Sequence, residues 1–146
     1  MGQVFLEYGT QLKAVSLFRY LGRTLSYTYN NFPAVEQNLW RARGKWGRLA
    51  KILERKGEDK RMTGRFYVAV VQVVLLFGFE VWVLTPRLEK SLKGFHQRAA
   101  WRMAGMGPKH QQDGTWLYPS IGAALVMMGL EEIGVYFACS QNMVAK

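Results

Sequence analysis

The chain reads NFPAVEQNLWRARGKWGRLAKILERKGEDKRMTGR from residue 31 to residue 65, and this stretch has the pattern of one helix with two opposed faces. At a helical angle of about 100° per residue, one narrow arc collects apolar side chains and the other side collects cations. The apolar arc consists of Leu39, Ala42, Trp46, Leu49, Ala50 and Leu53. The opposite side holds Arg41, Lys45, Arg48 and Arg55, with Lys51 and Lys56 beside them. We therefore expect this helix to pack on one face and to present positive charge to water on the other.

The ends of this helix are marked by residues with clear positional preferences. Asn31 or Phe32 lies at the expected cap, and Pro33 occupies the first helical position, where the missing N–H is tolerated. Gly57 is the expected stop, so the helix should run to about Lys56.

Positive charge is concentrated in the same stretch. Between Arg41 and Arg65 there are ten Lys or Arg residues against three acids, while the whole chain of 146 residues has a formal net charge of +10. A pI near 10.0 favours polyanionic partners, with nucleic acid first and an anionic membrane surface second. A packed helix with a cationic stripe is a candidate for binding nucleic-acid backbone. The alternative is an ordinary solvated helix face.

The composition indicates a globular chain in a reducing compartment. Hydrophobic residues make up 49% of the chain and charged residues 21%, which argues against disorder. Cys139 is the one cysteine, so we expect neither a disulfide framework nor a cysteine-based zinc site. Residues 1–8 lack a basic segment followed by an apolar core, so we expect no secretory signal. These features predict an intracellular protein, nuclear or cytoplasmic.

The segment 66–84, FYVAVVQVVLLFGFEVWVL, is almost wholly apolar and long enough to require a membrane test. Gln72 and Glu80 interrupt it, and a charged side chain at the centre of a membrane helix costs about 2.5–3.5 kcal/mol. We therefore expect a helix to about Phe77, surrounded by protein because it has no polar face, then a break at Gly78 and an extended piece. A membrane anchor over these residues is the alternative.

The remaining pattern predicts strands followed by helices. Residues 4–8 and 12–21 resemble two short strands joined by a turn near Gly9 and Thr10. Further helices are expected at about 59–77, from Thr85-Pro86 to an end at Gly105 to Gly107, at 120–128 and at 130–143, with a polar loop over 108–114. The helix after Thr85 has the core stripe Leu88, Leu92, Phe95, Ala99, Met103 and Met106. The expected fold class is mainly α, with a short N-terminal strand hairpin (1–29) before a bundle of about three to five helices (30–146).

Three blocks, taken in order, carry a family resemblance. They are FRYLGR (18–23), LLFGFEVW (75–82) and LKGFHQRAAWRMAGMG (92–107). Together they resemble the C-terminal part of a non-LTR retrotransposon reverse transcriptase, over about the whole chain. In that family a Tyr-Leu-Gly block closes the palm, a helical thumb with a Tyr-Gly-x-Glu-x-Trp-like block follows, and a later helix carries F-x-R-x-x-R-x-x-x-G. The matching motif residues here are Tyr20, Leu21, Gly22, Gly78, Glu80 and Trp82.

The chain also departs from the family pattern. Phe77 stands where Tyr is usual, Phe79 replaces a small polar residue, and Trp101 stands where a basic residue is expected. The family's catalytic aspartates lie upstream, in an aromatic-x-Asp-Asp turn and at a separate Asp, and no part of this chain matches either.

The resemblance therefore implies a non-catalytic palm-end and thumb fragment of an RNA-directed DNA polymerase. It implies no cofactor in this chain, although the full-length family enzyme uses magnesium. The implied partners are an RNA/DNA template–primer duplex and the palm and fingers of a parent polymerase, and a membrane is not an expected partner. Two alternatives remain: a small membrane-associated protein anchored by residues 66–84, and a retroelement remnant with no selected activity.

Candidate nucleic-acid-binding residues come from the cationic stripe and from the resemblance. Five of them, spaced to follow a phosphate backbone, are Arg41, Lys45, Arg48, Lys51 and Arg55. Gly44 and Gly47 would let that backbone come close. The resemblance adds Arg19 and Arg23, placed near the primer end. Trp40 lies off the apolar arc, where it either stacks on a base or sugar or packs against a neighbouring helix.

No catalytic residue or metal ligand is assigned, because the acids and histidines form no recognisable catalytic pattern. For Glu80 the resemblance implies a buried or half-buried carboxylate paired with an Arg, and an exposed strand residue is the equal alternative. His96 lies beside the core stripe of its helix, so packing or a cap-like hydrogen bond is its expected role. Cys139 is expected to be a small buried residue.

Overall fold

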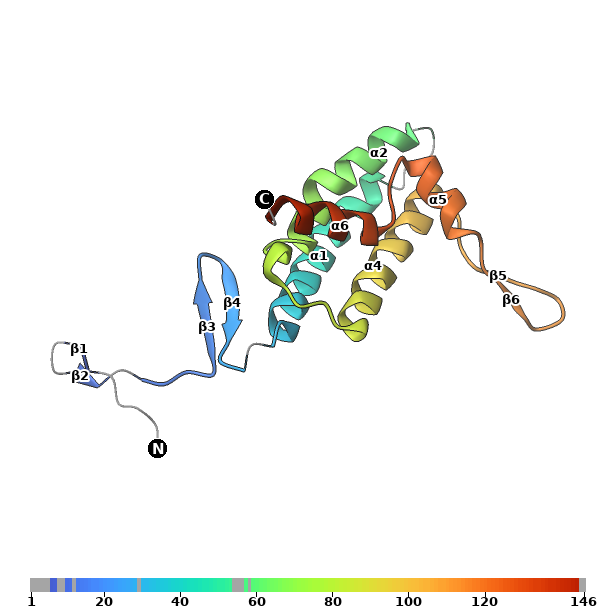
Figure 1. Cartoon of the computed structure of the whole chain (residues 1–146). Helices are drawn as coiled ribbons and strands as arrows, with labels where there is room; N and C mark the ends of the chain where they lie inside the picture. The colour runs from blue at the N-terminus through green and yellow to red at the C-terminus, as the bar shows by residue number, and fades with distance from the viewer. Residues whose placement is uncertain are drawn as a thin grey trace.

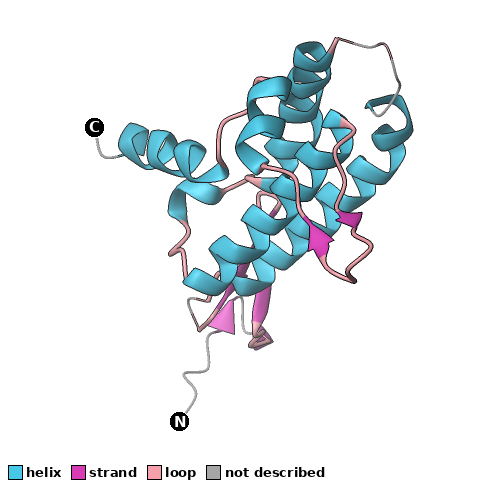
Figure 2. Cartoon of the chain, turned by 90° about the vertical axis from the view of Figure 1, so that its right-hand side faces the viewer, coloured by secondary structure: helices cyan, strands magenta, loops and turns pink. Residues whose placement is uncertain are grey.

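A computed structural model describes residues 6–7, 10–11, 13–28, 30–53, 57 and 59–144 of the chain. Helices build the body of the molecule, and three short antiparallel hairpins lie at its periphery (Figures 1 and 2). The α-helices are α1 (Phe32–Leu53), α2 (Lys60–Tyr67), α3 (Val73–Leu75), α4 (Pro86–Ala104), α5 (Ile121–Met128) and α6 (Ile133–Val144). Two further helical turns are η1 (Val68–Gln72), a π-helix, and η2 (Phe79–Val81), a 3₁₀-helix. The strands are β1 (Leu6–Glu7), β2 (Thr10–Gln11), β3 (Leu17–Tyr20), β4 (Arg23–Ser26), β5 (Lys109–His110) and β6 (Trp116–Leu117). The predicted fold class is confirmed.

The strand pairing differs from the prediction. The expected pair, 4–8 with 12–21, is replaced by two separate hairpins, β1–β2 and β3–β4, and part of both expected strands lies outside the described residues. The chain reverses at Leu21 and Gly22, which both have positive φ, and pairs Tyr20 with Arg23. The predicted polar loop 108–114 is wrong in part, because its first residues form the hairpin β5–β6.

Helix α1 begins where the sequence indicates. The backbone N–H of Val35 donates to the carbonyl of Asn31 at 3.0 Å, and Phe32 is the first helical residue. The predicted apolar arc faces the core: Leu39, Ala42, Trp46 and Ala50 are buried and Leu49 is half-buried. The helix ends at Leu53, before the predicted end near Lys56, and residues 54–56 lie outside the described part of the chain.

A continuous helical run from Lys60 to Leu75 follows and contains a π-helical turn. Asp59 caps its start by accepting the N–H of Arg61 at 2.9 Å. Within η1 the N–H of Val73 donates to the carbonyl of Val68, an i→i+5 bond that widens the turn locally. The expected break at Gly78 is confirmed by its left-handed φ of 73°. The expected extended piece is wrong at its start, because residues 79–81 form η2.

The apolar segment is only partly enclosed, contrary to the prediction. Tyr67, Val71 and Leu75 are fully buried, but Phe66 is 57% exposed and Val73 60% exposed. The run therefore has an inner and an outer apolar face. Of the described residues, no single helix is both long and apolar enough to cross a membrane, whereas Ile121–Met128 and Ile133–Cys139, bent by 62°, reach that length and composition as a pair.

Helix α4 has both predicted ends. The hydroxyl of Thr85 accepts the N–H of Leu88 at 3.4 Å, and Gly105 closes the helix with φ 70°. Its predicted core residues Leu88, Leu92, Phe95, Ala99 and Met103 are buried, while Met106 lies beyond the helix and is half-buried.

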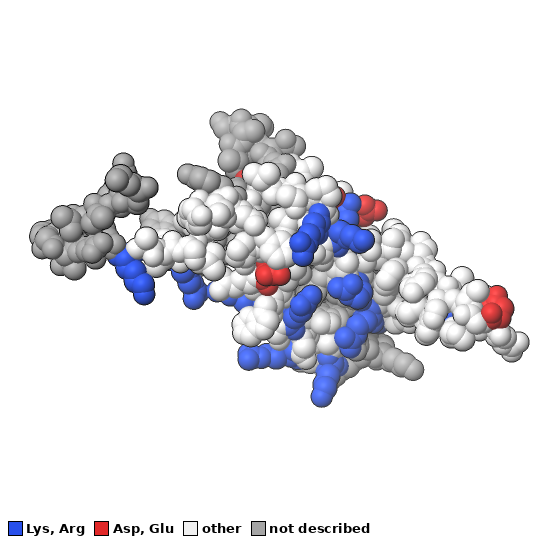
Figure 3. Space-filling model, turned by 90° about the horizontal axis from the view of Figure 1, so that it is seen from below, with Lys and Arg blue, Asp and Glu red and all other residues white. Residues whose placement is uncertain are grey.

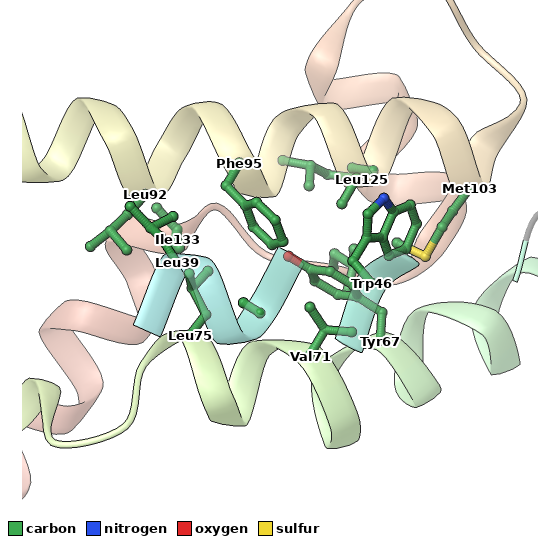
Figure 4. Packing of buried hydrophobic residues seen from close by; sticks show 14 of the residues in the cluster. Leu39, Trp46, Tyr67, Val71, Leu75, Leu92, Phe95, Met103, Leu125 and Ile133 are labelled. Atoms are coloured by element: carbon green, nitrogen blue, oxygen red, sulfur yellow. The ribbon is translucent and has the colours of Figure 1, made fainter. Parts of the chain in front are cut away.

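One core joins these helices. Figure 4 shows side chains of α1, the 60–75 run, α4 and α5 meeting around Tyr67 and Trp46. The rings of these two residues pack edge to face, with their centroids 6.0 Å apart. Helices α2 and α5 approach closely because Gly64 has no side chain: a Cβ there would lie 2.0 Å from the carbonyl oxygen of Met128. On α6, Cys139 is exposed, so its predicted burial is wrong.

Candidate nucleic-acid interface

A groove of about 820 Å³ runs between α1, the end of the 60–75 helical run and the turn of the β3–β4 hairpin. Cations of α1 line one side of it, and apolar side chains line the rest. The lining residues are Gly22, Trp40, Arg41, Arg43, Gly44, Lys45, Arg48, Val73, Val74 and Phe77. We call this the first groove; no acidic side chain is among its lining residues.

The structure brings the main predicted binding residues together. Arg41, Lys45 and Arg48 all line the first groove, on the side of α1 away from its buried arc. Lys45 and Arg48 are exposed, and Arg41 is half-buried. Lys51 is exposed one turn further along α1, whereas Arg55 lies outside the described residues. Their placement on one side of one helix satisfies the geometric condition for a cationic stripe.

The two arginines of the β3–β4 hairpin are not brought into the groove. Arg19 is exposed on β3. The side chain of Arg23 lies across Gly78, where an added Cβ would come within 3.5 Å of its Cδ, and its buried Nε has no hydrogen-bond partner. Arg23 instead lines a smaller pocket with Val83.

A second groove of about 620 Å³ lies between α1 and α4 and shares Trp40 and Arg43 with the first. Its other cations are Arg87, Lys90 and Arg98 of α4, and Glu36 is the acid among its lining residues. We define the cationic face as the seven cations that line the two grooves: Arg41, Arg43, Lys45, Arg48, Arg87, Lys90 and Arg98. Figure 3 shows Lys and Arg side chains gathered on one side of the helical body, with few acids between them.

The sequence reading missed the contribution of α4 to this face. The sequence indicates that Arg87, Lys90 and Arg98 point outward on their helix. It does not indicate that α4 runs beside α1, because that depends on the tertiary structure. The ion pair between Lys93 Nζ and Glu89 Oε1, at 2.8 Å, lies outside the face. Six of the seven cations are exposed and Arg41 is half-buried, so an external anion can reach the face, although Arg87 also lies over the ring of Phe32 with its Cζ 4.6 Å from the ring centroid.

The apolar floor of the first groove is held in place by a buried amide. Asn38 of α1 is 5% exposed, and its Nδ2 donates to the carbonyls of Phe77 at 2.8 Å and Leu75 at 3.4 Å. These carbonyls end the 60–75 run, where no helical N–H remains to bond them. The Asn38 bonds therefore fix the turn that presents Phe77, and Gly22 of the hairpin approaches that ring from the other side.

The motif residues of the family resemblance occupy contrasting environments. Tyr20 and Leu21 are 58% and 81% exposed, and Gly22 and Gly78 adopt the left-handed conformation. Trp82 is buried and packs edge-on against Phe79 at 5.8 Å. Glu80 is exposed on η2, so it is neither the buried partner of an Arg nor a strand residue.

His96 is buried and serves the core. Its Nε2 donates to the carbonyl of Glu131 at 2.9 Å, so Nδ1 accepts from the hydroxyl of Tyr67 at 3.1 Å. Burial lowers the pKa of His96 and raises the pKa of Tyr67, which keeps both side chains neutral. This confirms the predicted packing and hydrogen-bonding role and ties α2 and α4 to the α5–α6 connection.

The aspartates have local roles in the backbone. Asp59 caps α2, and Asp113 accepts the N–H and hydroxyl of Thr115 in the turn of β5–β6, at 2.9 and 2.6 Å. These bonds lower the pKa of Asp113. Among the described residues, no three His, Cys, Asp or Glu side chains come close enough together to hold a metal ion.

Comparison of the chain with protein-family models, with curated proteins and with solved structures gives no match.

Proposed function

We propose that this chain binds nucleic acid through phosphate contacts made by the cationic face. The observation that supports the proposal is the clustering of seven cations from α1 and α4 around two adjoining grooves, with one acid among the lining residues. Backbone contacts of this kind position a nucleic acid and carry no sequence information by themselves. We therefore expect binding with little sequence preference and strong dependence on salt.

The spacing of the cations on α1 suits a phosphate backbone. Arg41 and Arg48 are seven residues apart, about 10 Å along a helix that rises about 1.5 Å per residue. A strand of a duplex presents about three phosphates over that length. Gly44 and Gly47 are exposed between these cations, and an added Cβ at either would meet nothing within 4 Å. Because neither residue has a side chain, a phosphate backbone can come close to the helix there.

The narrower form of the proposal follows the family resemblance. In it the chain is a non-catalytic thumb and palm-end fragment of a reverse transcriptase, its ligand is an RNA/DNA template–primer duplex, and its protein partners are the palm and fingers of the parent polymerase. Strand β3 is exposed, and among the described residues no further strand pairs with the β3–β4 hairpin, which suits contact with further protein.

A charge-reversal triple variant tests the proposal. Replacing Arg41→Glu, Lys45→Glu and Arg48→Glu should abolish duplex binding, because it puts carboxylates where phosphates would lie. The control reverses three exposed cations that line neither groove, Lys13→Glu, Arg61→Glu and Lys109→Glu, and lowers the net charge by the same amount.

Binding is followed by fluorescence anisotropy of a labelled RNA/DNA duplex, after thermal melts have shown that both variants are folded. The control should retain most of the wild-type affinity. Equal loss in both variants would mean that only the overall charge matters, and the cationic face would lose its assigned role.

A further inference from the structure

The first groove has an apolar component that phosphate binding leaves unexplained. Trp40 is 74% exposed and Phe77 is 47% exposed, and both line the groove together with Val73 and Val74. The outside of a duplex offers charged phosphates, while its base faces are stacked against one another inside. A ligand that matches both sides of this groove must carry negative charge and an accessible apolar face.

We propose that the first groove holds an unpaired nucleotide segment, with its phosphates on Arg41, Lys45 and Arg48 and a base against Trp40 or Phe77. This inference rests on the proposed function and narrows its ligand to single-stranded nucleic acid or to the overhang beside a duplex. Cationic grooves with exposed aromatic side chains are the usual means of binding single strands, because every base has a π-face on which to stack. The groove volume of about 820 Å³ lies within the range of about 300–1,000 Å³ typical of ligand sites.

The backbone that carries Phe77 is fixed before any ligand arrives. Asn38 bonds the carbonyl of Phe77 at 2.8 Å, Gly78 ends the run with φ 73°, and Gly22 lies against the ring, where an added Cβ would come within 3.7 Å of it. Trp40 stands on α1 between the two grooves and lines both. A preorganised backbone at Phe77 loses little conformational entropy on binding, which favours a specific role for this ring over incidental exposure.

Binding of the full chain to three labelled probes tests the inference: a single-stranded oligonucleotide, a blunt duplex, and the same duplex with a single-stranded overhang. We expect the single strand and the overhang duplex to bind more tightly than the blunt duplex. Trp40→Ala or Phe77→Ala should weaken binding of the unpaired probes by about tenfold, the scale of one lost base stack, and weaken binding of the blunt duplex less. Phe66→Ala is the matched control, since Phe66 is an exposed aromatic on the same helical run that does not line the groove.

The outcomes separate this inference from the proposed function. Equal affinity for all three probes would overturn the inference, and so would unchanged binding in both aromatic variants. The proposed function would still stand in these cases if binding weakens with added salt. Failure to bind any probe overturns both. Sedimentation with anionic vesicles that survives high salt and is lost in Phe77→Ala would assign the groove to a lipid surface and also overturn the inference.

Discussion

His96 acts as a neutral cross-link between elements of the core. A protonated His96 would have two N–H donors, and the Tyr67 hydroxyl would then face a donor instead of the acceptor it bonds at 3.1 Å. Burial lowers its pKa in the folded state below the unfolded value of about 6.5. The unfolded chain therefore binds the proton more readily, and stability is fully present above about pH 6.5 and is lost as the pH falls.

We predict that the free energy of unfolding decreases from pH 7 to pH 5, by at most about 1.4 kcal/mol per pH unit from this one site. His96→Gln keeps an amide that can donate to Glu131 but cannot be protonated, so its stability should change less over the same range. His110→Gln is the control, since His110 is exposed on β5. Its ring packs edge to face against Trp116, with the ring centroids 4.9 Å apart. Urea unfolding at several pH values measures all three proteins. A pH profile of His96→Gln identical to that of the wild type would contradict the assignment.

Residue environments were predictable where they depend on the local sequence. Asn31, Thr85 and Gly78 mark the ends of helical runs because cap chemistry and left-handed backbone act within a few residues. The exposure of Cys139 was predicted wrongly, and that of Glu80 was left open between two readings, because both depend on which distant element, if any, covers the side chain.

At the scale of elements, the close contact of α2 and α5 depends on one missing side chain. Gly64 is buried on α2, and the carbonyl of Met128, the last residue of α5, occupies the space in which a Cβ would lie. The exposed glycines of α1, Gly44 and Gly47, differ from Gly64, because an added Cβ at either would meet nothing within 4 Å. A glycine in a helix normally lowers stability, so its presence here indicates a packing requirement.

We predict that Gly64→Ala lowers the free energy of unfolding by about 1–3 kcal/mol, the usual cost of overpacking. The clash at 2.0 Å exceeds what the better helix propensity of alanine can offset. Gly47→Ala, at an exposed position of α1 with nothing within 4 Å, should instead raise it by about 0.5–1 kcal/mol. Thermal or urea melts of the two variants give the comparison. A stabilising Gly64→Ala would show that α2 and α5 are not in contact at this point.

Elements whose form depends on partners beyond their own residues escaped the sequence reading. β4 has no strong strand pattern of its own and exists because the chain reverses at Leu21 and Gly22 and pairs with β3. It is joined to α1 by a hydrogen bond from the Thr24 hydroxyl to the Gln37 side chain. Likewise, the outer face of the 60–75 run stays exposed because no element of the described chain covers Phe66 or Val73.

At the scale of the whole molecule, the two grooves are a product of packing. The buried arc of α1 brings it against α4, and the outward cations of both helices then share one side of the body (Figure 3). On α1 the sequence predicted Arg41, Lys45 and Arg48 but not Arg43, which lines both grooves. The half on α4 could not be derived, because the relative direction of two helices is decided by the core between them.

The salt dependence of duplex binding tests the central claim most directly, that the cations of α1 contact phosphates. If about four of them do so, the logarithm of the association constant should fall against the logarithm of salt concentration with a slope of about −3 to −4. In the triple variant Arg41→Ala, Lys45→Ala, Arg48→Ala the slope should become less steep by about 3, since about three phosphate contacts are lost. A wild-type slope near zero, or an unchanged slope in the triple variant, would contradict the account.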